Sequence, residues 1–170
     1  RPFTNLPLRI NLLRYLPLSK HIRSLDENGH ITGIYPVLPE QYACAPVEDY
    51  GDDLIVQSFA DLHLHAPQYP MLGTGMDLPL LDWLNTYAFP TEARFADTGY
   101  AREIYSRLAR ELIANGTTRV CMFSSLHTDA TLILMEELEK AGVTGYVGKV
   151  NMDRNAAPRP VGGDHRGVQA

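Results

Sequence analysis

The sequence predicts an α/β fold built on a parallel sheet. From His63 onward, the segments follow the order strand, helix, strand, helix, strand. The strand segments are mostly apolar along their length, which is typical of parallel strands buried on both faces. This alternation predicts βαβ units with right-handed crossovers.

Two long helices and one short helix are expected between the strands. The clearest is "TGYAREIYSRLARELIANG", whose apolar residues recur at helical spacing and which Gly116 should end as a C-terminal cap. The segment "ATLILMEELEKAG" predicts a helix that begins at a cap, Thr128 or Asp129, and stops at Gly142. Asp77 is expected to cap the short helix "LPLLDWLNTY".

The strand segments are shorter and rich in β-branched residues. "TTRVCMFSS" and "TGYVGKVNM" predict strands, and Cys121 in the first of them is expected to be buried. "LIVQSFADLHLH" is strand-like and forms either one strand or two short strands bent at Gln57 and Ser58. "ENGHITGIY" predicts a turn at Asn28 and Gly29 followed by a strand, whereas residues 1–25 show no sustained period.

Composition narrows the class of protein. The net charge is 15 − 20 = −5, which argues against a nucleic-acid surface. No apolar run approaches the roughly 20 residues that a membrane helix needs. Cys44 and Cys121 form no metal-type pair, so a reducing, cytoplasmic setting is the default expectation. The chain begins with Arg1 rather than Met, which hints at a piece of something larger.

The stretch "DLHLHAPQYP" holds the main candidate site. Side chains alternate along a strand, so His63 and His65 should point to the same side, with Asp61 one step earlier. Two neutral imidazoles on one face suit zinc, and Asp61 would orient one of them as an outer partner. A single His-x-His often marks nothing, but burying two unpartnered imidazoles would cost about 1–3 kcal/mol each.

Three segments together carry a resemblance to a known family. "ADLHLHAPQYPMLGTGMDLPLLDWLNTYAFPTEARF", "NGTTRVCMFSSLHTDATLILMEELEKAG" and "YVGKVNMDRN" closely resemble, in this order, the guanine deaminases of the amidohydrolase superfamily. The resemblance covers about residues 26–155. It implies the N-terminal part of a (β/α)8 TIM-type barrel over 58–155, preceded over 1–57 by an N-terminal segment and part of a small β-sandwich. Residues 156–170, rich in Pro and Gly, are expected to be disordered.

The resemblance also implies a function, the zinc-dependent hydrolysis of guanine to xanthine and ammonia. His63 and His65 are similar to the family's first two zinc ligands. The substrate-binding positions that the resemblance implies are His65, Ala66, Pro67, Gln68 and Trp83. Gln68 would hydrogen-bond the base edge, because a primary amide offers both a donor and an acceptor. The alternatives are a loop glutamine that faces water and a tryptophan that only packs in the core.

Further polar residues follow the later strands. Ser124, Ser125 and His127 come after "VCMF", and His127 either touches substrate or, as we favour, only helps a helix to start. Asn151 and Asp153 end the last strand segment, and Lys149 precedes them on the same face. We assign these last three residues no role.

The family takes its remaining zinc ligands and its catalytic acid–base residue from later strands, so no catalytic residue is assigned in this chain. Beyond His65 only His127 and His165 remain as histidines. Two alternatives therefore stay open: an inactive fragment or remnant, and another amidohydrolase that acts on a different heterocycle. The expected partner is a small molecule, guanine, with no nucleic acid and no membrane. An exposed barrel edge is compatible with a homodimer.

Overall fold

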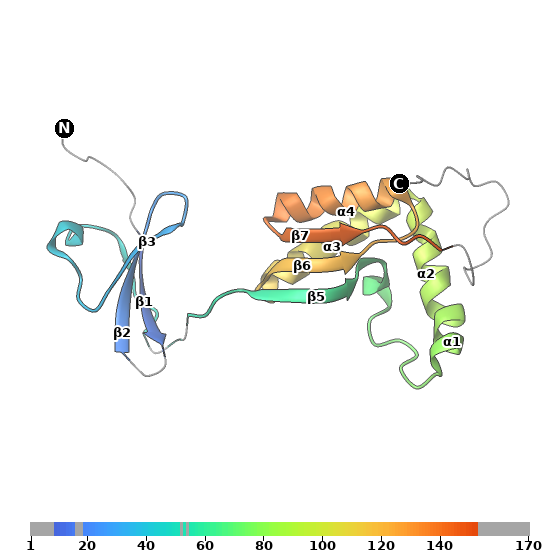
Figure 1. Ribbon diagram of the computed structural model, residues 1–170, viewed down its shortest axis with the longest axis horizontal. Coiled ribbons are helices and arrows are strands. Elements are labelled where there is room, and N and C mark those ends of the chain that lie inside the picture. The colour runs from blue at the N-terminus through green and yellow to red at the C-terminus, as the bar shows by residue number, and fades with distance from the viewer. Residues whose placement is uncertain (1–8, 16–18, 52, 54, 153–170) are drawn as a thin grey trace. The chain divides into compact units, whose positions relative to one another are not determined.

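A computed structural model describes residues 9–15, 19–51, 53 and 55–152. The chain folds as two compact units, Arg1–Gln57 and Ser58–Ala170 (Figure 1). The tail expected to be disordered, 156–170, lies outside the described residues, as do Asp153 and His165.

The first unit contains a four-stranded sheet in the order β3-β2-β1-β4. Its elements are β1 (Arg9–Tyr15), β2 (Ser19–Leu25), β3 (Ile31–Tyr35), the short 3-10 turn η1 (Glu40–Tyr42) and β4 (Val47–Glu48). Strands β1, β2 and β3 pair antiparallel, and β4 runs parallel to β1. The sequence pattern predicted β3 but not β1 or β2, because the apolar residues of 1–25 follow no regular alternation.

The turn between β2 and β3 lies where Asn28 and Gly29 predicted it. The Asp26 carboxylate accepts hydrogen bonds from the backbone amides of Asn28, at 2.9 Å, and His30, at 2.8 Å. These bonds lower the pKa of Asp26, and the bond from the His30 amide has the largest effect. Gly29 has a φ of +82°, a left-handed conformation that a residue without a Cβ adopts at little cost. Local side-chain chemistry therefore sets this hairpin.

The second unit confirms the predicted parallel α/β arrangement. Strands β5 (Phe59–His65), β6 (Thr117–Phe123) and β7 (Thr144–Gly148) form a parallel sheet in the order β5-β6-β7. The helices and turns are η2 (Ala66–Met71), α1 (Leu80–Trp83), the π-type turn η3 (Leu84–Ala88), α2 (Phe89–Ala93), η4 (Arg94–Ala96), α3 (Thr98–Ala114) and α4 (Thr128–Ala141). With three strands, this sheet does not close into a barrel.

Helix α3 confirms the clearest sequence prediction. Its buried stripe includes Ile104, Leu108 and Leu112. At its start Asp97 is the N-cap residue, and its carboxylate accepts hydrogen bonds from the backbone amides of Gly99 at 2.8 Å and Tyr100 at 3.2 Å. After its end, Gly116 takes a φ of +78°, as the predicted cap requires.

The starts of the other two helices differ from the prediction. Helix α4 ends at Gly142 as expected, but neither Thr128 nor Asp129 caps it. Its N-cap residue is His127, whose backbone carbonyl accepts a hydrogen bond from the Thr131 amide at 3.1 Å. Asp77 does not cap α1 either, because that helix begins after Pro79 with no side-chain cap. A capping residue is fixed by where the chain turns, which the sequence pattern locates only to within a few positions.

The core of this unit lies on one face of the sheet, against α3 and α4 (Figure 1). Along β6, Val120 and Met122 are buried in that core, whereas Cys121 and Phe123 on the other face are exposed. The expectation that the strands are buried on both faces is therefore wrong for the described residues, and so is the expected burial of Cys121. Helices cover one face, and the described chain supplies no second layer.

A charged cluster joins the two long helices on their outer side. Arg102 of α3 forms ion pairs with Glu137 at 2.8 Å and Glu136 at 3.0 Å, both on α4. Lys140 also pairs with Glu137 at 2.7 Å. The Lys140 hydrogen bond, with help from Arg102, lowers the pKa of Glu137. Glu137 thus pairs with two cations, Arg102 from α3 and Lys140 from its own helix.

We expect Glu137→Gln to reduce the pH dependence of stability. Because the folded-state pKa of Glu137 is lowered, its contribution is present near neutral pH and is lost as the pH falls through the acidic range. The substitution should cost about 0.5–1 kcal/mol at pH 7 and much less at pH 3, since the partners are partly exposed. Urea unfolding at the two pH values measures it. Glu139→Gln, at an exposed position of the same helix, is the control. If Glu137→Gln lowered the free energy of unfolding equally at both pH values, the proposed role of the ionised Glu137 would be contradicted.

Candidate metal and purine site

The site begins at an irregularity in β5. Asp61 lies opposite Val120 of β6, but Leu64 lies opposite Met122, so β5 carries an extra residue between these two pairs. The Asp61 carboxylate accepts a hydrogen bond from the backbone amide of His63 at 3.1 Å. The expectation that Asp61 orients an imidazole is therefore corrected: its described bond holds the backbone of the bulge.

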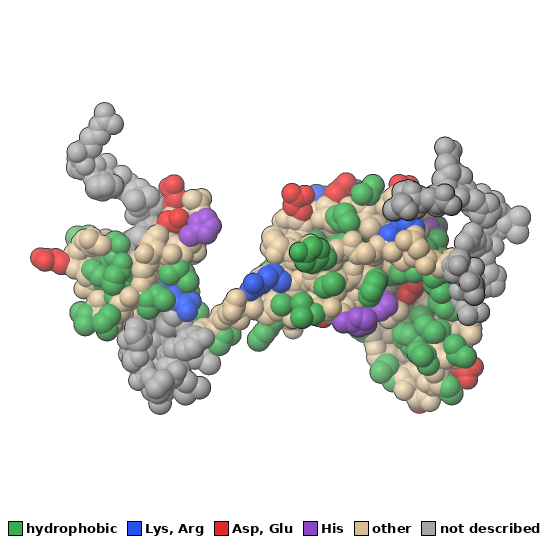
Figure 2. Space-filling model, in the orientation of Figure 1, with side chains coloured by type: hydrophobic (Ala, Val, Ile, Leu, Met, Phe, Trp, Pro, Cys, Tyr) green, Lys and Arg blue, Asp and Glu red, His purple; other side chains and the backbone are tan. Residues whose placement is uncertain are grey.

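The two imidazoles lie together on the same side of the strand, as the alternation predicted. The ring centroids of His63 and His65 are 5.1 Å apart. The ring of Phe123, at the end of β6, lies 5.9 Å from His63 and 5.1 Å from His65. Leu64 packs against the core on the opposite side, whereas Leu62, which the alternation would have placed beside it, is 75% exposed. In Figure 2, histidine surface lies beside hydrophobic surface near this end of the sheet.

The electrostatic setting favours an uncharged imidazole at His65. Burial lowers the pKa of His65, the nearby His63 lowers it further, and the Glu92 carboxylate partly opposes both effects. The neutral ring is the form that offers a lone pair to a metal ion. His65 is half-buried and His63 is exposed, so the pair opens from the sheet toward the surface.

The segment after His65 turns directly into η2. Ala66 and Pro67 are buried, which anchors the turn, and Gln68 is half-buried. Gln68 Nε2 donates a hydrogen bond to Glu92 Oε1 of α2 at 2.9 Å. The structure thus brings Gln68 close to the imidazole pair through the turn and through the shared neighbour Glu92.

Trp83 lies on α1, at the end of a separate loop. Its indole Nε1 donates a hydrogen bond to the Thr74 carbonyl at 2.8 Å, and its ring flanks Gly75. The side chain is half-buried, and its described polar contact is with this loop. Its expected role in the purine pocket therefore stays a prediction.

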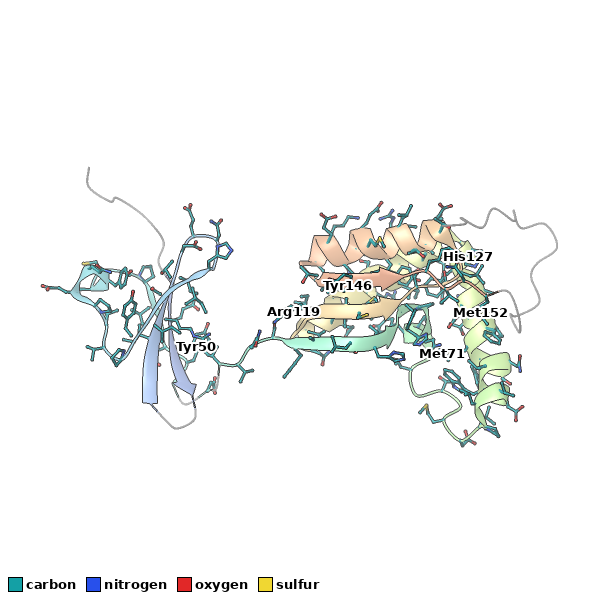
Figure 3. All side chains as sticks on the ribbon, viewed as in Figure 1. Tyr50, Met71, Arg119, His127, Tyr146 and Met152 are labelled. Atoms are coloured by element: carbon teal, nitrogen blue, oxygen red, sulfur yellow. The ribbon has the colours of Figure 1, made fainter. Side chains whose placement is uncertain are left out.

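A second group of polar residues follows β6 and β7. Ser124 and Ser125 are buried, and Ser124 Oγ lies 3.2 Å from the Tyr105 hydroxyl, whose pKa burial raises to about 12. His127 contributes its backbone to the start of α4, and its Nε2 is buried with no hydrogen-bond partner among the described residues. Figure 3 shows His127 and Met71 at the same end of the sheet, away from Arg119.

Burial, followed by the charge of Lys149, lowers the pKa of His127. Lys149 Nζ donates hydrogen bonds to Asn151 Oδ1 at 2.6 Å and to the Leu126 carbonyl at 3.3 Å. Lys149 thus ties the end of β7 to the loop before α4. Sequence reasoning gave no role to Glu92 or Tyr105, because nothing in their local pattern marks them.

The described residues do not complete a metal site by themselves. Across residues 9–15, 19–51, 53 and 55–152, no group of three His, Cys, Asp or Glu side chains is placed to hold one ion. An apolar groove of about 230 Å³ runs beside β5 and touches His65, and its wall comes from β5, the η2 segment, the C-terminal part of α3 and the start of β6. A catalytic zinc site normally has three protein ligands, and the imidazole pair could supply at most two of them.

Comparison with known proteins identifies the class. The profile of the Amidohydrolase family matches residues 54–169, and the chain belongs to this family. Within the family, its relatives include guanine deaminases. The chain is 50% identical over 103 residues to the guanine deaminase of Rattus norvegicus, covering 61% of this chain and 23% of the relative. It is 42% identical over 110 residues to that of Escherichia coli K12, covering 65% and 25%.

A solved structure agrees with these relatives. The guanine deaminase from C. acetobutylicum, with guanine bound in its active site, superposes with a TM-score of 0.74 at 42% identity. The match covers 90% of this chain and 38% of that one. The resemblance to guanine deaminases is confirmed, and the chain spans about a quarter of the length of the curated relatives it matches. The family match runs to residue 169, past residue 155, where we expected the resemblance to stop.

Among the helices that the structure describes, none combines the length and the apolar character needed to cross a membrane.

Proposed function

We propose that this chain carries the first two zinc ligands and part of the purine pocket of a guanine deaminase, an enzyme that hydrolyses guanine to xanthine and ammonia. One observation carries the proposal. His63 and His65 lie with their rings 5.1 Å apart at the end of β5, directly before the turn that holds Gln68. This arrangement falls inside the segment that matches the Amidohydrolase family.

The two imidazoles that the chain supplies are suitable ligands for zinc. Neutral imidazoles are preferred zinc ligands, and the lowered pKa of His65 favours that form. The third ligand and the acid–base residue would come from chain outside the described residues. In this proposal β5, β6 and β7 are the first strands of a (β/α)8 barrel, 58–155 is its first part, and 1–57 is an N-terminal segment with part of a β-sandwich.

Each residue of the site has a defined task in the proposal. His63 and His65 hold the ion, which when bound supplies Lewis-acid activation of a water molecule. Gln68 hydrogen-bonds the edge of the base, and Trp83 walls the pocket. Ala66 and Pro67 have an indirect role, because their buried side chains anchor the turn η2 that carries Gln68.

We expect the isolated chain to bind zinc through the imidazole pair and to show no deaminase turnover. Outer partners of metal ligands are worth about 10- to 100-fold in affinity, so removing a ligand should cost at least as much. Zinc titration by calorimetry should therefore give binding that weakens at least roughly tenfold in His63→Ala and in His65→Ala. His30→Ala, which removes an exposed imidazole from the first unit, should leave the affinity unchanged.

Turnover is measured in the same samples, with guanine, added zinc and detection of xanthine. Xanthine that forms above the His63→Ala background would show that the chain is catalytically complete, contrary to our expectation. Equal zinc affinity in all variants would overturn the assignment of the ligands. No xanthine together with His63-dependent zinc binding is the expected result.

A further inference from the structure

We propose that Glu92 is a positioning residue that fixes the orientation of the Gln68 carboxamide. This inference rests on the proposed function for its consequence, because Gln68 is the group expected to read the base edge. The contact itself is independent of any ligand. Gln68 Nε2 donates to Glu92 Oε1 at 2.9 Å across 24 residues of chain, and it joins the turn η2 to helix α2.

The two residues stand on well-anchored elements. Gln68 follows two buried residues of η2, Ala66 and Pro67. Glu92 lies on α2, between the buried Ala88 and the buried Phe95. Both side chains are half-buried, so water competes only partly for their hydrogen bond. The contact therefore joins two side chains whose neighbours along the chain are buried.

Glu92 differs from the other half-buried or buried glutamate of this unit. Glu137 pairs with Arg102 and Lys140. In the described part of the chain, no lysine or arginine forms an ion pair with Glu92, and its hydrogen bond comes from the neutral Gln68 amide. A half-buried carboxylate that has no cationic partner gains less stability from its position than a paired one does. Its placement makes chemical sense if its task is to hold Gln68.

The chemistry of the pair decides which way the amide faces. A carboxylate can only accept hydrogen bonds, so the group that Gln68 turns toward Glu92 must be its NH2. One N–H of Gln68 is then committed to Glu92. The carbonyl oxygen and the second N–H remain for a ligand, in one fixed order. Without Glu92, the carboxamide can rotate by half a turn and present the reverse order equally well.

A fixed order matters for recognising a purine. The edge of guanine carries donors and acceptors in a set sequence, and a carboxamide pairs with two neighbouring groups only when its own order is complementary. Glu92 would thus make Gln68 selective for one sequence of donor and acceptor. Loss of Glu92 would leave Gln68 in place but without that selectivity.

The test uses the full chain and the side-chain amide signal of Gln68 in ¹⁵N NMR spectra. In the unsubstituted chain one Gln68 amide proton should exchange slowly with water. In Glu92→Leu its exchange should become at least roughly tenfold faster, since a hydrogen bond to a charged group is lost. Glu92→Gln keeps the size of the side chain and should give an intermediate rate, because a glutamine accepts only in one of its two orientations.

Two controls separate positioning from folding. Glu139→Gln removes a carboxylate from an exposed position of α4 and should not change the Gln68 signal. Fluorescence of Trp83, the single tryptophan, reports whether each variant keeps the fold of its unit. Unchanged Gln68 exchange in both Glu92 variants would overturn the proposal. Faster exchange in folded variants would support it.

Guanine is then added to the same samples. A guanine-dependent shift of the Gln68 signal that weakens in the Glu92 variants supports both the positioning role and the proposed pocket. If the Gln68 exchange depends on Glu92 but guanine shifts no Gln68 signal, the positioning role stands and the pocket assignment for Gln68 fails. The two proposals therefore fail in distinguishable ways.

Discussion

In a complete barrel that carries residues 26–155 of this chain, His63→Ala should lower kcat/KM for guanine by more than about 100-fold. The graft into a homologous guanine deaminase should itself keep activity, because the chain is 42% identical to the guanine deaminase from C. acetobutylicum and superposes on it with a TM-score of 0.74. In that barrel the proposed ligands His63 and His65 would meet the further ligands that the described residues lack. Removing one imidazole takes away a direct ligand, which should cost more than removal of an outer partner.

Metal analysis of the graft gives a second measurement. Zinc content should fall in His63→Ala and His65→Ala together with kcat/KM. His30→Ala lies within the grafted segment but in the turn before β3, and it should change neither quantity. A His63→Ala graft that still holds one zinc per chain and turns over guanine normally would contradict the ligand assignment.

Phe95→Ala should destabilise the second unit by about 3–5 kcal/mol, the usual cost of removing a buried phenylalanine ring. Phe95 has no exposed surface, and its ring stacks on Tyr105 with centroids 4.8 Å apart. It also contacts the ring of Tyr100 edge-on at 5.1 Å. The substitution would leave a cavity beside the rings of Tyr100 and Tyr105, on which Phe95 of η4 packs.

Urea unfolding followed by Trp83 fluorescence measures this loss, because that residue lies in the same unit. Tyr146→Ala is the matched control, since the Tyr146 ring is 81% exposed and its removal should change stability by less than about 0.5 kcal/mol. A loss below about 1 kcal/mol for Phe95→Ala would mean that this aromatic cluster does not hold the unit together.

The sequence predicted those parts of the fold that depend on local periodicity. The stripe of Ile104, Leu108 and Leu112 defined α3, and Gly142 marked the end of α4. Strands β6 and β7 followed from their β-branched, apolar runs. Strands β1 and β2 were missed because segments whose own apolar pattern is irregular can still form strands when their neighbours in the sheet pair with them.

The candidate site was predicted only where strand alternation controls it. The shared side of His63 and His65 followed from the period of a strand. The hydrogen bond of Asp61 with the His63 amide could not be predicted in this way, because it depends on the bulge in β5. The contact of Gln68 with Glu92 joins positions far apart in the chain, and no local pattern announces it. Helix capping by His127 rather than Thr128 likewise depends on where β6 ends.

The one-sided core has a consequence for the behaviour of the chain in solution. Leu62, Phe123 and Tyr146 leave 75%, 41% and 81% of their surface exposed, outside the core that α3 and α4 cover. Exposed apolar side chains of different molecules attract one another, and at a net charge of −5 the molecules also repel. Added salt weakens the repulsion and leaves the attraction, so the colloidal stability of the purified chain should decline as ionic strength rises.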